Sequence, residues 1–294
     1  MQEIRGCITA LVTPFNEEGG IDKNALEDLI LRQLDSGVHG LVPCGTTGES
    51  PTLSHEEHEE VIRITINTVK KRVPVIAGTG SNSTEEALRL TIAAEKAGAD
   101  ASLQVVPYYN KPNQSGLYEH FDKIAKNTSL PIILYNIPGR SVVSLETTTI
   151  KKLNKQNKNI VGIKEASGSM DKVREIKSEC PEDFIILSGE DGLNFQILKA
   201  GGRGYISVTS NIAPKECSEL FNNFIKNDIK KAEEIDSKLS ELNKILFIDT
   251  NPIPIKYALY KAGLCNNILR LPLVELDSEK AKIVSTELST LKLI

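Results

Sequence analysis

Apolar and polar positions follow two patterns that alternate along the chain. Short apolar runs rich in β-branched residues recur about every thirty residues, and each precedes a longer segment whose apolar positions have helical spacing. The first pattern predicts buried parallel strands, and the second predicts amphipathic helices. The predicted strands are 6–12, 40–43, 73–77, 101–106, 131–135, 160–164, 184–187 and 204–208. The predicted helices between them include 24–35, 55–69, 84–97, 117–127, 171–178 and 193–200.

Eight strand and helix units predict a closed (β/α)8 barrel, the TIM-barrel architecture of the α/β class. After the eighth strand the pattern is helical, in segments 216–227, 229–247, 254–262 and 278–291. We therefore expect a barrel domain over 1–226 and a C-terminal helical domain over 227–294.

The composition narrows the kind of partner. Of the 294 residues, 25% are charged and 40% hydrophobic, which is typical of a globular protein with a sizeable core. Lys and Arg number 35 against 39 Asp and Glu, so the formal net charge is −4. Because no basic excess is present to neutralise phosphates, we expect no nucleic-acid partner.

Targeting and metal signals are weak. Residues 1–6 have neither a basic nor an apolar leader pattern, and no apolar run approaches the ~18 residues of a membrane span, so we expect a cytoplasmic protein without membrane contact. The five cysteines are scattered and form no C-x-x-C pair. We therefore expect neither a disulfide framework nor a metal site.

Chemistry in such a barrel belongs at the carboxyl ends of the strands, where the sixth predicted strand ends in Lys164. Removal from water favours the neutral amine, which attacks carbonyl carbons. Lys164 is thus a candidate Schiff-base residue. The alternatives are an ion pair with Glu165 and a lysine that reaches solvent.

The fifth predicted strand places Tyr135 at its end and Arg140 on the following loop. A phenol beside an amine can shuttle protons, and a guanidinium fork matches a carboxylate. The alternative is a packed tyrosine and a surface arginine. Pro138 and Gly139 predict a turn that holds Arg140 in place.

The loop after the second strand carries Thr46 and Thr47 between two glycines. Its hydroxyls and N–H groups suit a small carboxylate or a proton relay, although an ordinary βα turn has a similar composition. After the fourth strand, Tyr108 and Tyr109 stand on a proline-bounded loop. Exposed tyrosines on a barrel rim indicate a subunit contact, which is compatible with a catalytic role.

Four motifs together carry a resemblance: Gly45-Thr-Thr-Gly-Glu-Ser50, Pro107-Tyr-Tyr-Asn110, Tyr135-Asn-Ile-Pro-Gly-Arg140 and Gly162-Ile-Lys-Glu-Ala-Ser167. In this order on a barrel, the chain resembles the dihydrodipicolinate synthase family of pyruvate-dependent class I aldolases and lyases over its whole length. The resemblance implies condensation of pyruvate with L-aspartate 4-semialdehyde, the committed step of diaminopimelate and lysine biosynthesis. It also implies a covalent pyruvate imine on Lys164 with no separate cofactor.

The resemblance assigns roles to the catalytic candidates. Lys164 forms the imine and Tyr135 shuttles protons. Thr46 relays between Tyr135 and Tyr109 of a neighbouring subunit. This arrangement implies a homotetramer built as a dimer of tight dimers.

The resemblance also assigns substrate contacts. Thr47 holds the pyruvate carboxylate and Arg140 holds the carboxylate of the semialdehyde. Gly189 and Ile206, at the ends of the seventh and eighth strands, line the pocket through backbone groups. Ser141 and Gly189-Glu-Asp depart from the threonine and the Gly-Asp-Asp that are common in the family.

A feedback site for L-lysine at the tight interface is implied for Ser50, Pro51, His55, His58, Asn82, Glu86 and Tyr108. Glu86 meets the ligand ammonium, whereas Asn82 and Tyr108 meet its carboxylate. Pro51 departs from a frequent alanine. The alternative is a plain helix start, because Ser54 and Glu57 have the spacing of a capping box.

Two other functions compete with the synthase activity. N-acetylneuraminate lyase and keto-deoxy-sugar-acid aldolases use the same lysine and tyrosine, but they resemble this chain less at Thr47 and Arg140. A non-catalytic sensor of pyruvate or lysine is the second alternative. The complete set of lysine, tyrosine, threonine and arginine argues against lost chemistry.

Overall fold

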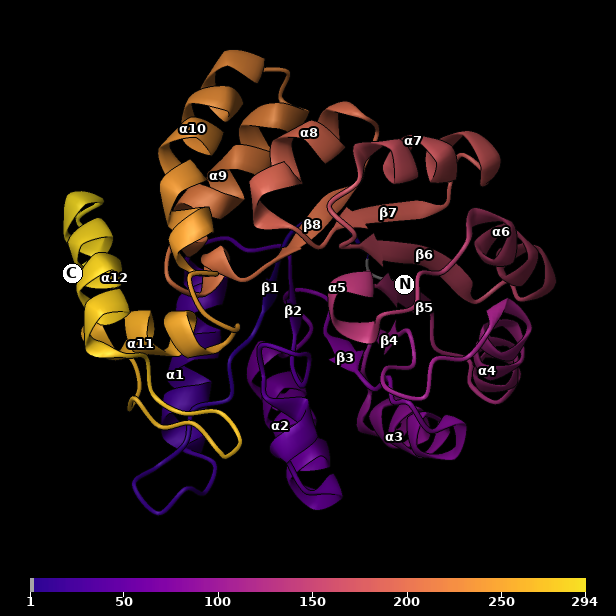
Figure 1. Cartoon of the computed structure of the whole chain (residues 1–294), viewed down its shortest axis with the longest axis horizontal. Helices are drawn as coiled ribbons and strands as arrows, with labels where there is room; N and C mark the ends of the chain where they lie inside the picture. Colours follow the sequence, from indigo (N-terminus) through magenta and orange to yellow (C-terminus); the bar gives the residue numbers. More distant parts are fainter. Residues whose placement is uncertain (1–2) are drawn as a thin grey trace.

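A computed structural model describes residues 3–294 and shows a TIM barrel of eight parallel strands, as predicted (Figure 1). Residues 1 and 2, the first of the segment that lacks a leader pattern, lie outside the described residues. The strands are β1 Gly6–Ala10, β2 Gly40–Val42, β3 Ile76–Gly78, β4 Ala101–Val105, β5 Ile132–Asn136, β6 Ile160–Glu165, β7 Ile185–Ser188 and β8 Gly204–Ser207. Their hydrogen-bonded order is β2-β1-β8-β7-β6-β5-β4-β3.

The barrel nearly closes between β2 and β3 through one parallel bridge, Leu41 with Val75. β3 begins three residues after its predicted start at 73. The physical reason is local, since Pro74 has no N–H for a ladder and the N–H of Val75 instead donates to Asp100 Oδ2 at 3.0 Å. The other strands begin within a residue of their predicted starts.

Helices surround the barrel and follow the strands in turn (Figure 1). They are α1 Lys23–Asp35, α2 His55–Val69, α3 Thr84–Ala97, α4 Gln114–Lys126, α5 Pro138–Ser141, α6 Thr147–Gln156, α7 Met170–Glu179 and α8 Asn194–Lys199. The predicted capping box opens α2, because Glu57 N–H donates to Ser54 Oγ and Ser54 N–H donates to Glu57 Oε2. α5 and α6 are not among the predicted helices.

The C-terminal helices are α9 Pro214–Ile225, α10 Ile229–Ile245, α11 Ile253–Lys261 and α12 Ser278–Thr290. They gather on one side of the barrel, beside α1 and α8 (Figure 1). One buried cluster contains Leu26 and Leu29 of α1 together with Leu242, Leu259 and Val284 of the C-terminal helices. The division into domains 1–226 and 227–294 stays a prediction.

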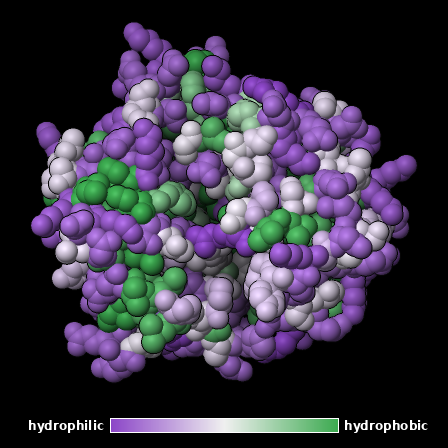
Figure 2. All heavy atoms as spheres, in the orientation of Figure 1, coloured by the Kyte–Doolittle hydropathy of each residue, from purple (hydrophilic) through white to green (hydrophobic). Residues whose placement is uncertain are grey.

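Side chains fill the inside of the barrel. Ile8, Val42, Leu103, Leu187 and Ile206 belong to one buried cluster contributed by five different strands. A filled interior leaves the strand ends as the place for a ligand. Figure 2 shows that the outer face seen in this view is mostly hydrophilic, with hydrophobic residues in separate patches. No helix within residues 3–294 is long and apolar enough to cross a membrane.

Candidate active site

A cavity of about 240 Å³ lies at the carboxyl ends of the strands. The loops after β2, β4 and β5 contribute most of its lining, and β3 contributes Gly78. The lining residues are Cys44, Gly45, Thr46, Ser50, Pro51, Gly78, Gly80, Leu103, Val105, Tyr108, Tyr135, Ile137, Arg140 and Ser141. Thr46, Tyr135 and Arg140, three of the predicted site residues, thus share one cavity.

Lys164 lies beside this cavity, against the ring of Tyr135. The two residues are register partners in β6 and β5, and Lys164 Nζ is 4.1 Å from the ring centroid. The lysine is 7% exposed. Gly189 makes room for it, because a Cβ at that position would stand 2.8 Å from Lys164 Cε. The prediction that Lys164 and Tyr135 lie together at the strand ends is confirmed.

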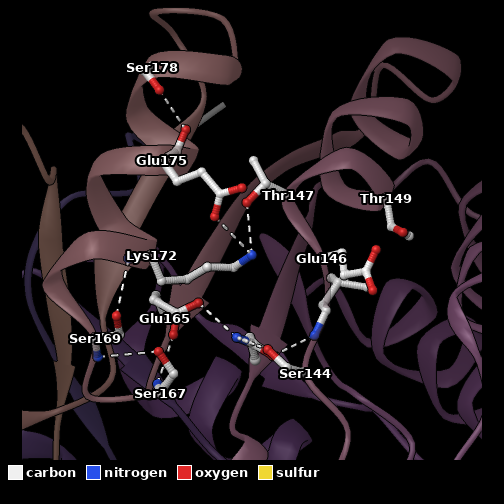
Figure 3. A network of polar contacts seen from close by, with 12 residues as sticks. Ser144, Glu146, Thr147, Thr149, Glu165, Ser167, Ser169, Lys172, Glu175 and Ser178 are labelled. Carbon is white, nitrogen blue, oxygen red and sulfur yellow. Dashed lines mark hydrogen bonds and ion pairs between the residues drawn. The ribbon is translucent and has the colours of Figure 1, made fainter.

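Among the described residues, Lys164 forms no ion pair. The neighbouring carboxylate is occupied elsewhere: Glu165 accepts hydrogen bonds from Asn136 Nδ2 at 2.9 Å and from the N–H of Ser167 at 2.7 Å (Figure 3). The alternatives of a Glu165 ion pair and of a lysine in solvent are therefore wrong. A lysine that is buried without a carboxylate partner is rare in folded proteins, which favours a functional role for Lys164 over a structural one.

Glu190, in the loop after β7, interacts electrostatically with Lys164. Burial and the neighbouring Asp191 raise the pKa of Glu190, and Lys164 opposes this rise. Asp191 has fixed partners, because its Oδ2 accepts from the N–H groups of Val208 and Thr209 at 2.8 and 3.0 Å. The departure at Glu190 therefore places a carboxyl group with a raised pKa near the lysine.

The two threonines of the β2 loop have different surroundings. Thr46 faces the cavity, whereas Thr47 is buried. Thr47 Oγ1 accepts a hydrogen bond from Asn251 Nδ2 at 3.1 Å, which leaves the hydroxyl hydrogen free to donate. Thr13 Oγ1 holds the same loop by donating to the carbonyl of Gly48 at 2.7 Å.

Arg140 is carried by α5 and lines the cavity. The predicted turn at Pro138 and Gly139 is instead one turn of helix, because Pro138 occupies its first position, which suits a residue without an N–H. Arg140 Nη2 donates to the carbonyl of Asn251 at 3.0 Å. One guanidinium edge is thereby fixed while the side chain stays in the cavity lining.

Asn251 is the residue that sequence reasoning missed. It lies between α10 and α11 and contacts both Thr47 and Arg140. It follows no strand but belongs to the helical extension, so the rule that chemistry lies at strand ends does not point to it. The available signal was a run of three polar residues, Asp249, Thr250 and Asn251, directly before Pro252 at the junction between two predicted helices.

Gly189 and Ile206 lie outside the lining of the 240 Å³ cavity. The N–H of Gly189 donates to the carbonyl of Glu165 at 2.8 Å, and the residue contacts the Lys164 side chain instead. Ile206 is buried in the barrel interior and pairs with Ile8. Their predicted backbone roles toward a ligand stay predictions.

Several residues of the predicted lysine site lie together on α2, α3 and the β4 loop. His55 Nε2 is 2.8 Å from Glu86 Oε1, and Ser81 Oγ donates to the other carboxylate oxygen. These hydrogen bonds lower the pKa of Glu86. Burial and Glu86 in turn raise the pKa of Tyr108. The chain thus presents a carboxylate with a phenol nearby.

The remaining members of that set surround this cluster. Ser50 and Pro51 line the 240 Å³ cavity. His58 is buried, its Nε2 is 2.8 Å from the carbonyl of Gly78, and burial lowers its pKa to about 4. Asn82 accepts a hydrogen bond at its carbonyl. His58 is therefore neutral near pH 7 and contacts the β3 backbone.

Comparison with known proteins gives the family. The model of the dihydrodipicolinate synthetase family matches residues 3–291. The chain belongs to this family. It is 49% identical over 291 residues to a 4-hydroxy-tetrahydrodipicolinate synthase of Bartonella bacilliformis, with 99% of each chain covered.

Solved structures of the family share the fold closely. The 4-hydroxy-tetrahydrodipicolinate synthase of Methylacidiphilum fumariolicum has a TM-score of 0.97 and 48% identity, covering 99% of this chain and 96% of that one. The dihydrodipicolinate synthase of Acinetobacter baumannii, solved in complex with pyruvate, has a TM-score of 0.97 and 43% identity, covering 99% and 100%. The enzyme of Cyanidioschyzon merolae, with lysine bound, has a TM-score of 0.95 and 38% identity, covering 99% of both chains.

Tyr109 does not line the 240 Å³ cavity. Its side chain is 88% exposed, and its φ of 72° lies in the left-handed region that bulky residues rarely adopt. Its neighbour Tyr108 lines the cavity. Such an exposed, strained aromatic on a rim loop is typical of a group whose partner is another molecule.

Proposed function

We propose that the protein condenses pyruvate with L-aspartate 4-semialdehyde to give 4-hydroxy-tetrahydrodipicolinate, as a lyase of lysine and diaminopimelate biosynthesis. The observation that carries this function is Lys164, a buried lysine with no ion-pair partner among residues 3–294, which lies against the ring of Tyr135 beside the cavity. Full-length relatives named as synthases at 49% identity support it over a sugar-acid aldolase or a sensor.

The reaction begins when the neutral amine of Lys164 attacks the carbonyl carbon of pyruvate. The carbinolamine then loses water to give a protonated imine, and Tyr135 is placed to move the protons that these steps exchange. The imine accepts electrons when the pyruvate methyl loses a proton. The resulting enamine carbon attacks the aldehyde carbon, and water later releases the lysine or an internal amine displaces it.

Two groups fit the two carboxylates of the substrates. The hydroxyl of Thr47, whose oxygen already accepts from Asn251, has its hydrogen free for the pyruvate carboxylate. Arg140 lines the same cavity and presents its remaining N–H groups to the semialdehyde carboxylate. Thr46, which lines the same cavity, relays protons between Tyr135 and Tyr109 of a neighbouring subunit.

The covalent imine replaces any cofactor in this proposal. Among residues 3–294 no group of three His, Cys, Asp or Glu side chains is arranged to hold a metal ion. The steps above need only an electron sink and proton transfers, which the imine and Tyr135 supply. Activity that survives extensive dialysis against a chelator is the expected result.

Assembly and regulation belong to the same proposal. Tyr109 completes the relay of a neighbouring subunit in a homotetramer, and free L-lysine binds at the interface with its ammonium on Glu86. Support comes from the exposed Tyr109 and from the Glu86 carboxylate near Tyr108. A cytoplasmic location is part of the proposal.

A coupled assay tests the proposed function. Purified protein is supplied with pyruvate and L-aspartate 4-semialdehyde, with and without L-lysine, and product formation is followed. We expect turnover that requires both substrates and falls when lysine is added. Turnover with pyruvate and a sugar aldehyde alone would contradict the proposal, and insensitivity to lysine would contradict the effector site only.

A further inference from the structure

A second buried lysine, Lys256 of α11, forms a fully buried ion pair. Its Nζ donates to Glu49 Oε1 at 2.6 Å, and both side chains have no exposed surface. Lys256 belongs to the C-terminal extension, whereas Glu49 belongs to the β2 loop. The pair therefore joins two parts of the chain that the sequence separates widely.

Each end of the pair has further partners. Lys256 Nζ also donates to the carbonyl of Ile268 at 2.6 Å and lies 4.1 Å from the ring centroid of Phe15. Glu49 Oε2 accepts from the N–H of Arg270 at 3.1 Å. With both charges satisfied, the pair has one defined geometry and cannot turn toward other groups.

Glu49 is tied to the loop that carries the proposed carboxylate site. It follows Thr47 by two residues, and its φ of 53° lies in the left-handed region. A non-glycine residue keeps this conformation only where its surroundings enforce it. The backbone at Gly48 is closely packed, because a Cβ there would stand 3.1 Å from the carbonyl oxygen of Leu11. The position of the Glu49 carboxylate thus sets the backbone of the loop.

The same short stretch of the extension reaches the loop a second time. Asn251 donates to Thr47 Oγ1 at 3.1 Å and accepts from Arg140 at its carbonyl. Lys256 follows in the helix that begins directly after Pro252. The segment from Asn251 to Lys256 therefore binds the β2 loop at two points, by a hydrogen bond to Thr47 and an ion pair with Glu49.

A stability role alone does not explain a buried ion pair, because packed apolar residues of similar volume stabilise as well or better. Such an ion pair instead fixes the positions of its two charged groups. We propose that Lys256, through Glu49, is a positioning residue that sets the orientation of Thr46 and Thr47 for pyruvate. This inference rests on the proposed function of the loop.

The test measures pyruvate binding and turnover in Lys256→Met and in the double variant Glu49→Gln with Lys256→Met. The double variant leaves no unpaired buried charge, so it should fold even where the single variant loses stability. The matched control is Val284→Ala, a buried residue of α12 in the same extension. Thermal unfolding is recorded for all three variants.

We expect the KM for pyruvate to rise about tenfold in both Lys256 variants. In Val284→Ala the KM should stay within twofold of the parent value, even if the melting temperature falls as much as in the Lys256 variants. A rise of less than fivefold in a folded Lys256 variant overturns the inference. If Lys256→Met does not fold, the double variant decides. Because the comparison is made relative to the parent, failure of the parent to condense the two substrates overturns the proposed function instead.

Discussion

Two buried lysines show how differently one fold can use the same side chain. Lys164 Nζ lies 4.1 Å from the ring centroid of Tyr135, and Lys256 Nζ lies 4.1 Å from that of Phe15. Both are almost or fully shielded from solvent. The difference is their partners, because Lys256 has a carboxylate at 2.6 Å, whereas Lys164 has none among the described residues.

This difference assigns the two roles. The hydrogen bonds to Glu49 and Ile268 hold the Lys256 ammonium in place. Burial lowers its pKa and Glu49 opposes the change. Lys164 instead lies beside a cavity lined by Thr46, Tyr135 and Arg140, the groups proposed to transfer protons and bind a carboxylate. A neighbouring cavity and the lack of an ion-pair partner among the described residues, rather than burial, distinguish Lys164 from Lys256.

The largest effect is expected for Lys164→Ala. Loss of the nucleophile removes the covalent route, so kcat should fall by a factor on the order of a thousand or more. Steady-state assays with both substrates measure it. Lys164→Arg is the control that keeps the positive charge without a reactive amine, and near-parental turnover in either variant would break the contrast between the two lysines.

Tyr135→Phe separates the ring of Tyr135 from its hydroxyl. The ring contact with Lys164 remains, but the proton shuttle is lost, so kcat should fall about 100- to 10,000-fold. Melting temperature should change little. An unchanged kcat would show that Tyr135 only packs its ring against Lys164, as Phe15 packs against Lys256.

Arg140→Ala tests the cavity that lies beside Lys164. Loss of charge-assisted bonds of roughly 1.5–3 kcal/mol each should raise the KM for the semialdehyde at least tenfold. Pyruvate imine formation should persist, which borohydride trapping measures. Equal losses for both substrates would contradict a role specific to the second carboxylate.

The smallest catalytic effect is expected for Phe15→Leu. The ring also lies 4.4 Å from the guanidinium of Arg270, so the variant loses two cation contacts and some packing. We expect the free energy of unfolding to fall by about 1–3 kcal/mol. Pyruvate should still react at Lys164. Denaturant titration measures the first quantity, and a stability loss below a few tenths of a kcal/mol would count against the contact.

The sequence predicted the parts of this comparison that follow from strand order. Lys164 and Tyr135 end neighbouring parallel strands, so their meeting follows from the alternation of strands and helices. The barrel and most helices followed from the same periodicity. β3 began later than predicted because a proline and a side-chain bond at Val75 altered the local pairing.

Other parts could not follow from local pattern. Asn251 meets Thr47 across 204 residues, and Lys256 meets Glu49 across 207 residues, so no periodicity links them. A lysine in an apolar helix gave no sign of which carboxylate it pairs with. The partner of Tyr109 belongs to another chain in the proposed assembly, and a single sequence contains no register for that contact.

Trapping of pyruvate tests the central claim most directly. The parent protein is incubated with pyruvate, reduced with borohydride, digested and mapped by mass spectrometry. The account predicts a pyruvyl adduct on the peptide that contains Lys164 and none on the peptide that contains Lys256. An adduct on Lys256, or on any lysine other than Lys164, would contradict it.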